Sequence, residues 1–133
     1  MMTYATAASP TAPRRVLVLD DDEILLEALD AMLTRMGVGH VALEADARGA
    51  LERLDEHRPD LMICDLMLPE MDGIEFLQAA AGQGYRGKVV LLSALDDGLR
   101  EAAGELARAL GLDVAAGLRK PISMEQLRSA VEC

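Results

Sequence analysis

The sequence predicts an α/β domain in which helices cover both faces of a parallel sheet. Short apolar runs alternate five times with segments whose apolar residues recur at helical spacing, and such alternation is typical of successive β/α units. Two of the apolar runs, 16–19 and 61–64, end directly on acidic residues. In open α/β sheets the ligand site lies at the carboxyl ends of the strands. We therefore expect these acids to meet at one edge of the sheet.

Short sequence signals mark the ends of the predicted elements. Gly37 and Gly111 follow helical patterns, at the position where glycine commonly ends a helix. Asp72 with Gly73 is expected to open the third helix, and residues 123–126 form a capping-box pattern that starts the last one. In chain order we expect strand 16–20, helix 23–36, edge strand 40–44, a helix from about 46, strand 61–65, a helix from 72, strand 88–93, helix 97–110, a shorter and weaker strand 113–118, and a last helix from 123.

Each predicted helix carries one apolar face, which we expect to pack on the sheet. The core must be largely aliphatic, because the chain contains one Phe, two Tyr and no Trp. The residues expected to face inward are Leu25, Leu29, Met32, Leu33 and Met36 in the first helix, Ala47, Ala50, Leu51 and Leu54 in the second, Ile74, Leu77 and Ala81 in the third, Leu99, Ala102, Ala103, Leu106 and Leu110 in the fourth, and Leu127 and Val131 in the last.

The composition is that of a globular domain with an acidic surface. Hydrophobic residues make up 51% and charged residues 27% of the 133 residues, and the formal net charge is −10. This charge argues against direct nucleic-acid binding. We expect a flexible leader over 1–13 and one domain over 14–133. Because no apolar stretch is long enough for a membrane span and the leader lacks a signal-peptide core, we expect a cytoplasmic protein without a membrane partner.

Polar residues follow four of the predicted strands. Asp20 and Asp21 end the first strand, Asp65 the third and Ser93 the fourth, and Lys120 lies just beyond the fifth. Clustered carboxylates repel one another, so such a pocket calls for a divalent cation or for a function. Mg²⁺ takes oxygen ligands, and a carboxylate can form an acyl phosphate. A hydroxyl and an ammonium would hold the phosphoryl oxygens. The set suits phosphoryl transfer to a carboxylate.

With these residues in this order, the chain resembles the receiver domain of a two-component response regulator over about residues 14–131. In that family an acid pair ends the first strand, the phospho-accepting Asp ends the third, Ser or Thr ends the fourth, and Lys-Pro follows the fifth. Residues 68–73 match the loop after the phosphorylation site, and Ala94 is the small residue expected after Ser93. The resemblance implies a flavodoxin-like, doubly wound sheet of five parallel strands in the order 2-1-3-4-5.

The resemblance also implies a role for each site residue. Asp65 would accept a phosphoryl group from a sensor histidine kinase or a phosphotransfer protein, with Ser93 and Lys120 beside it. Mg²⁺ would be bound by Asp21 and Asp65 directly, by Asp20 mainly through water, and by the backbone carbonyl of Met67. Such a domain is not an independent enzyme, although it assists its own phosphorylation and dephosphorylation. It switches an output domain or a separate partner, and a homodimer is among the expected assemblies.

Two features depart from the commonest family pattern. Many receivers carry an aromatic residue three positions before the lysine, where it turns inward on activation, but Gly117 stands there. Signalling is therefore expected to use shifts of the backbone or of helices. Residues 91–96, followed by a long helix over 99–111, resemble receivers fused to EAL-type cyclic-di-GMP phosphodiesterases. We thus expect an output partner of that type, in a longer regulator or as a separate protein.

Two other functions are alternatives to the interpretation of the chain as a phospho-accepting receiver. A haloacid-dehalogenase-like phosphotransferase would use Asp20 as its nucleophile, since residues 20–22 satisfy an Asp-x-Asp pattern. Ile24 lacks the hydroxyl expected there, no acidic pair follows the fourth strand, and a cap domain has no room. A degenerate receiver that only mediates contacts is the third class, and the complete set of site residues argues against it.

Some polar residues also admit structural interpretations. Asp20 or Asp21 could simply cap the first helix. Asp22 is interpreted as a solvated acid that favours the start of that helix. His40 and His57 lie at predicted element edges without a partner pattern, and both are expected to be exposed.

Overall fold

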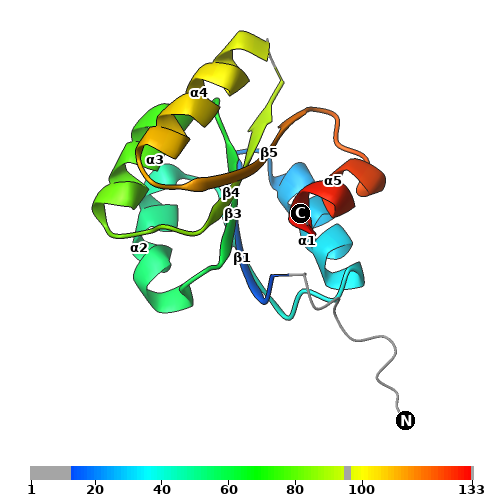
Figure 1. The fold of residues 1–133 in the computed structure, drawn as a ribbon. Coiled ribbons are helices and arrows are strands. Elements are labelled where there is room, and N and C mark those ends of the chain that lie inside the picture. Colours follow the sequence, from blue (N-terminus) through cyan, green and yellow to red (C-terminus); the bar gives the residue numbers. More distant parts are fainter. Residues whose placement is uncertain (1–12, 95–96, 133) are drawn as a thin grey trace.

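The computed structural model describes residues 13–94 and 97–132, which form five parallel strands and five helices. The elements are β1 (Arg15–Leu19), α1 (Glu23–Arg35), β2 (His40–Glu44), α2 (Ala47–His57), β3 (Leu61–Asp65), α3 (Gly73–Gly82), β4 (Lys88–Ser93), α4 (Asp97–Ala109), β5 (Asp113–Arg119) and α5 (Met124–Val131). The strand order is β2-β1-β3-β4-β5. Helices α1 and α5 cover one face of the sheet, and α2, α3 and α4 cover the other (Figure 1). The predicted fold and strand order are confirmed.

Two apolar layers, one on each face of the sheet, form the core. Leu17 of β1 and Met62 of β3 belong to the layer under α2, α3 and α4. Their neighbours Val18 and Ile63 belong to the opposite layer, under α1 and α5, because successive side chains of a strand point to opposite faces. All five residues of β3 are buried. The acid that ends β3, Asp65, is therefore held by the most enclosed strand of the domain.

The predicted helix ends are confirmed by their caps. Asp22 and Asp72 precede α1 and α3, and their carboxylates accept hydrogen bonds from backbone N–H groups of the first turns. Ser123 forms a reciprocal capping box at the start of α5. Gly37 and Gly111 follow α1 and α4 with φ values of 94° and 89°, a left-handed conformation that glycine adopts without steric cost. Within the described residues, no helix is long and apolar enough to cross a membrane.

The buried faces of α1 and α4 differ in part from the predicted ones. In α1, Leu26 is buried and Leu25 only half-buried. In α4, Ala102 is exposed, whereas Ala103 and Ala107 are buried. Adjacent helix residues point about 100° apart, so the choice between two neighbouring apolar residues depends on how the whole helix is rotated against the sheet. Packing sets that rotation.

β5 is longer than predicted. It has seven residues, whereas the other strands have five or six. Its pairing with β4 reaches Arg119, with one irregularity in register between Val89 and Val90. Ala115, Ala116 and Gly117 have little intrinsic preference for strands. Pairing with the buried strand β4 therefore decides the conformation of this segment.

The expectation that both histidines are exposed is wrong for His57. His40 is exposed, but His57 is half-buried at the end of α2. Its Nε2 atom lies 3.0 Å from the carbonyl oxygen of Val16, and the side chain of Arg15 donates a hydrogen bond to the His57 carbonyl. Burial, followed by the nearby cationic groups, lowers the pKa of His57 despite the contact with Val16. His57 thus joins α2 to β1.

Candidate functional site

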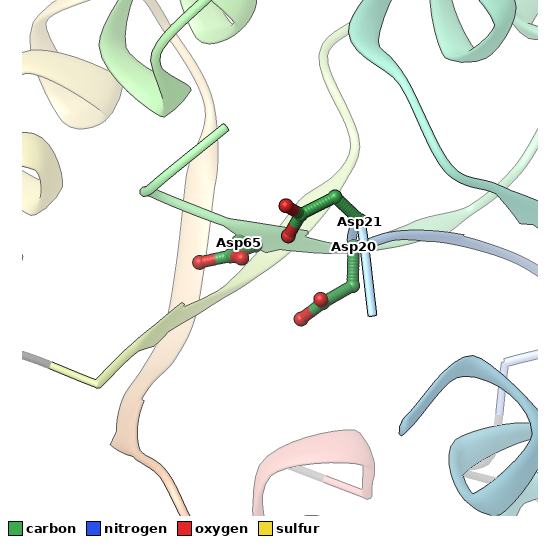
Figure 2. A group of neighbouring side chains, drawn as sticks. All are labelled: Asp20, Asp21 and Asp65. Carbon is green, nitrogen blue, oxygen red and sulfur yellow. The ribbon is translucent and has the colours of Figure 1, made fainter. Parts of the chain in front are cut away.

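Three carboxylates meet at the carboxyl ends of β1 and β3. Asp20 and Asp21 directly follow β1, and Asp65 is the last residue of the adjacent strand β3. Their side chains come from neighbouring strand ends (Figure 2), and one oxygen from each lies within 4.8 Å of the others. Asp20 and Asp65 are buried, whereas Asp21 is exposed. The predicted acidic pocket is therefore present, with two enclosed acids and one that faces solvent.

Asp20 is held from both sides of its carboxylate. Its Oδ1 atom accepts a hydrogen bond from the backbone N–H of Asp22 at 2.9 Å. Its Oδ2 atom lies 2.7 Å from the Nζ atom of Lys120. That oxygen is buried and accepts no hydrogen bond of regular geometry from the described residues, so the close ammonium is its main compensation. A buried carboxylate oxygen without a regular hydrogen bond is well suited to a further contact with a cation or an ordered water.

Asp65 is the central acid of the pocket and is only 2% exposed. Its Oδ1 atom accepts a hydrogen bond from the backbone N–H of Met67 at 3.0 Å, and its Oδ2 atom lies 3.2 Å from Lys120 Nζ. Burial raises the pKa of Asp65, and the negative charge of Asp20 adds to this. The contacts with Met67 and Lys120 act in the opposite direction but do not offset it.

Lys120 reaches the pocket from the segment after β5. Its backbone N–H donates to the carbonyl oxygen of Ser93 at 2.8 Å, which extends the β4–β5 pairing by one residue. Burial tends to lower the pKa of Lys120, but the close contact with the Asp20 carboxylate and the negative charges of Asp65 and Asp20 outweigh it, and the pKa is raised. The ammonium is therefore retained as a cation between the two buried acids.

Ser93 completes the set of strand-end residues. It is the last residue of β4 and is fully buried. The residue before it, Leu92, pairs with Asp65 in the sheet, and the Leu92 carbonyl accepts a hydrogen bond from the backbone of Leu66. This pairing and this hydrogen bond fix the carboxyl ends of β3 and β4 relative to each other. Ser93 therefore lies next to the end of β3 that carries Asp65. The next residue, Ala94, is exposed.

The loop after Asp65 folds back closely on itself. The backbone N–H of Gly73 donates to the carbonyl of Leu66 at 3.1 Å. A Cβ atom at Gly73 would come within 2.6 Å of the Cα atom of Leu66, so this close approach requires glycine. The turn leaves the side chain of Met67 47% exposed at the rim of the pocket. The predicted role of the Met67 carbonyl as a metal ligand stays a prediction.

The donor set fits a hard divalent cation. Three carboxylates and one ammonium leave an excess of negative charge, and every candidate ligand atom is oxygen. Mg²⁺ and similar ions prefer such oxygen donors and retain several waters, for which the exposed side chain of Asp21 leaves access. Asp22 is exposed at the start of α1, as predicted, and it caps this helix, a role that we considered for Asp20 or Asp21 instead.

A family model for the response regulator receiver domain matches residues 16–132 of this chain. The chain belongs to this family. The receiver is 32% identical over 123 residues to the Regulator of RpoS of Escherichia coli K12, covering 92% of this chain and 35% of that protein. It is 35% identical over 117 residues to the response regulator MprA of Mycolicibacterium vanbaalenii, covering 86% and 47%. The solved structure of the chemotaxis protein CheY4 of Vibrio cholerae has a TM-score of 0.77 at 28% identity, over 88% of this chain and 94% of that one.

Membership in the family confirms the function predicted from the motifs. The chain is a phospho-accepting receiver of two-component signalling, a class that interacts with histidine kinases or phosphotransfer proteins and whose acidic pocket binds Mg²⁺. Receivers typically act as regulatory modules rather than as catalytic enzymes. The family match gives no support to the dehalogenase-like alternative. The receiver spans about a third to a half of the length of the curated relatives named above, and the EAL-type output stays a hypothesis.

The structure brings Asp20, Asp21, Asp65 and Lys120 together and places Ser93 at the end of the adjacent strand β4, but the sequence did not reveal how these residues contact one another. The ion pair of Lys120 with Asp20 joins residues that are distant in the chain and belong to non-adjacent strands. No local spacing could signal it. Likewise, the backbone N–H of Asp20 donates to the carbonyl of Glu44, a β1–β2 contact that depends on strand order alone.

Proposed function

We propose that Asp65 is the phosphoryl acceptor of this receiver, and that Asp20, Asp21, Asp65 and the Met67 carbonyl hold Mg²⁺ for the transfer. One observation carries the proposal: Asp65 ends β3, which lies in the sheet between β1, followed by the carboxylates of Asp20 and Asp21, and β4, which ends on Ser93. Asp20 also contacts the Lys120 ammonium and a backbone N–H, but it follows β1, which is not adjacent to β4.

In the proposed transfer, a carboxylate oxygen of Asp65 attacks the phosphorus of a phosphohistidine. The new bond joins that oxygen to phosphorus, and the bond between phosphorus and the histidine nitrogen breaks, leaving its electron pair on the imidazole. Bound Mg²⁺ would neutralise charge on the transferred phosphoryl oxygens. Lys120, 3.2 Å from Asp65, is placed to pair with one of these oxygens, and the hydroxyl of Ser93 is expected to donate to another.

The change at Asp65 would be transmitted through Ser93 and Lys120. Ser93 ends β4 shortly before α4, and Lys120 follows β5, so both elements respond if these side chains move toward a phosphoryl group. With Gly117 in β5 there is no ring to fill space vacated near Ser93. We therefore infer a backbone-borne shift of the segments flanking α4 and β5, which acts on an output domain or a separate partner.

Labelling with radioactive acetyl phosphate in the presence of Mg²⁺ tests the assignment. We expect the wild type to gain a base-labile phosphate and Asp65→Asn to gain none. Asp22→Asn is the matched control, because it changes a neighbouring acid that lies outside the proposed site and keeps the helix cap. If Asp65→Asn is labelled and Asp20→Asn is not, the acceptor is Asp20 and the proposal is wrong.

A further inference from the structure

The backbone of Asp20 is held by the carboxyl end of the edge strand β2. Its N–H donates to the carbonyl oxygen of Glu44 at 3.1 Å, one step beyond the last registered pair of β1 and β2, which is Leu19 with Glu44. On the other side of β1, the registered pairing with β3 already ends at Leu19. The position of the Asp20 carboxylate, which is fully buried, therefore depends on the position of the Glu44 backbone.

A side-chain contact with α2 fixes this end of β2. Because an edge strand has a strand partner on one side alone, it opens locally at lower cost than a central strand. The Glu44 side chain is 22% exposed, and its Oε2 atom lies 3.3 Å from the Nε atom of Arg53 in α2. That Nε atom is buried and forms no hydrogen bond of regular geometry with a described residue. The Glu44 carboxylate is therefore its close partner, and the ion pair joins β2 to α2.

Gly49 provides the space for this ion pair. A Cβ atom at Gly49 would overlap the Oε1 atom of Glu44 and would lie 3.4 Å from its Cδ atom. Gly49 and Arg53 are four residues apart in α2, so they lie on the same face of the helix. The Glu44 carboxylate thus packs on this face, with one oxygen against Gly49 and the other beside Arg53. We call Glu44, Gly49 and Arg53 the β2–α2 contact.

We propose that the β2–α2 contact positions the metal site. It fixes the carbonyl of Glu44, which holds the backbone of Asp20 and so keeps the Asp20 carboxylate near those of Asp21 and Asp65. A site whose ligands are already held in place binds its ion more tightly. The members of the contact are positioning residues, because they act through Asp20. The inference rests on the proposed function, which assigns these carboxylates to Mg²⁺.

Nuclear magnetic resonance of the isotope-labelled whole chain tests the proposal at two levels. Without metal, the amide hydrogen of Asp20 should exchange at least about twofold faster in Gly49→Ala and in Arg53→Met, because each variant loosens the end of β2. Titration with Mg²⁺, followed through the amide signals of the pocket, should show an affinity about two- to fivefold below that of the wild type. This range corresponds to the loss of a partly exposed ion pair. Thermal melting checks that each variant is folded.

Gly82→Ala and Arg48→Met are the matched controls. A Cβ atom at Gly82 in α3 would meet nothing within 4 Å, and Arg48 is exposed on the same helix as Arg53. Both control variants should match the wild type in the exchange of the Asp20 amide and in Mg²⁺ affinity. Arg53→Lys keeps the positive charge and should retain more of the affinity than Arg53→Met.

A double variant shows whether Gly49 acts through Glu44. The methyl group of Gly49→Ala would also lie 3.2 Å from the carboxylate of Asp46, which caps α2. In the Glu44→Ala background there is no Glu44 carboxylate to displace. Gly49→Ala should then cause no further loss of Mg²⁺ affinity, whereas an equal loss in both backgrounds would overturn the assigned role of Gly49.

The two measurements distinguish a failure of this proposal from a failure of the proposed function. If the wild type binds Mg²⁺ at the pocket but Gly49→Ala and Arg53→Met bind it equally well, the positioning role is wrong. This holds even if their Asp20 amide exchanges faster, since the contact would then be structural alone. A wild type whose pocket amides do not respond to Mg²⁺ would instead overturn the proposed metal site, and the positioning role with it.

Discussion

The Nζ atom of Lys120 lies 2.7 Å from the Oδ2 atom of Asp20, across the carboxyl ends of two strands that are not neighbours in the sheet. The same ammonium lies 3.2 Å from Asp65. Asp20 and Asp65 are buried, and among the described residues the cation that contacts both of them is Lys120. Lys120 therefore serves the fold as well as the proposed chemistry.

Replacing Lys120 by Met should destabilise the metal-free protein by about 3 kcal/mol, because removing one partner of a buried ion pair leaves uncompensated charge. Urea unfolding in the presence of a chelator measures the effect. Adding Mg²⁺ should restore part of the loss, since a bound cation supplies positive charge at the same carboxylates. Arg128→Met, an exposed cation on α5, is the control and should change stability little. A Lys120→Met protein as stable as wild type would refute the structural role.

Mg²⁺ should raise the melting temperature of the wild type in the millimolar range, because only the folded chain gathers the three carboxylates. The increase should grow as pH rises from 5 to 7, because burial raises the pKa of Asp65 and its carboxyl group must ionise to bind the metal. Asp21→Ala should reduce it strongly, whereas Asp22→Asn, which keeps the cap of α1, should respond like wild type. Equal responses of wild type and Asp21→Ala would show that the ion binds elsewhere.

His57 should make stability depend on pH. Its folded-state pKa is lowered by burial, so the unfolded chain binds a proton more readily. Its contribution to stability is complete above about pH 6.5 and is lost as pH falls from there through the lower folded pKa. Relative to His57→Gln, which cannot be protonated, the wild type should lose at most about 1.4 kcal/mol for each pH unit in that window. A wild-type-to-variant difference that is constant from pH 7.5 to 5 would contradict this role.

The parts of the fold that the sequence predicted best are those determined by local chemistry. The strands β1, β3 and β4 contain continuous apolar runs, which are stable only when they are buried away from water. Asp72 and Ser123 cap their helices through hydrogen bonds to residues three positions further along the chain. Because parallel strands align their carboxyl ends, the order of polar strand ends was enough to predict that Asp65, Ser93 and Lys120 would converge.

The features that the sequence did not predict depend on tertiary contacts. Nothing local distinguishes Leu25 from Leu26 as the buried residue of α1, and the full length of β5 depends on its pairing with β4. The half-buried position of His57 requires the Val16 carbonyl, which lies on another element. The segment that resembles EAL-linked receivers includes Leu95 and Asp96, which lie outside the described residues.

Hydrogen exchange with and without beryllofluoride, a mimic of the acyl phosphate, should locate the transmitted change. We expect altered protection in residues 94–100 and 117–122, because Ser93 directly precedes the first segment and Lys120 lies in the second. The change should be modest, with both states populated without the mimic. Asp65→Asn treated in the same way is the control and should show no response. Changes confined to α1 and α2 would contradict the proposed route.

Reductive trapping identifies the phosphoryl acceptor most directly. Borohydride converts an aspartyl phosphate to homoserine, and peptide mass spectrometry after treatment of the phosphorylated wild type then locates the modified residue. We predict homoserine at position 65 alone, because Asp65 ends β3 between the carboxylates that follow β1 and Ser93 at the end of β4, and contacts the Lys120 ammonium. Homoserine at position 20, with Asp65 unmodified, would contradict the assignment of Asp65 as the acceptor.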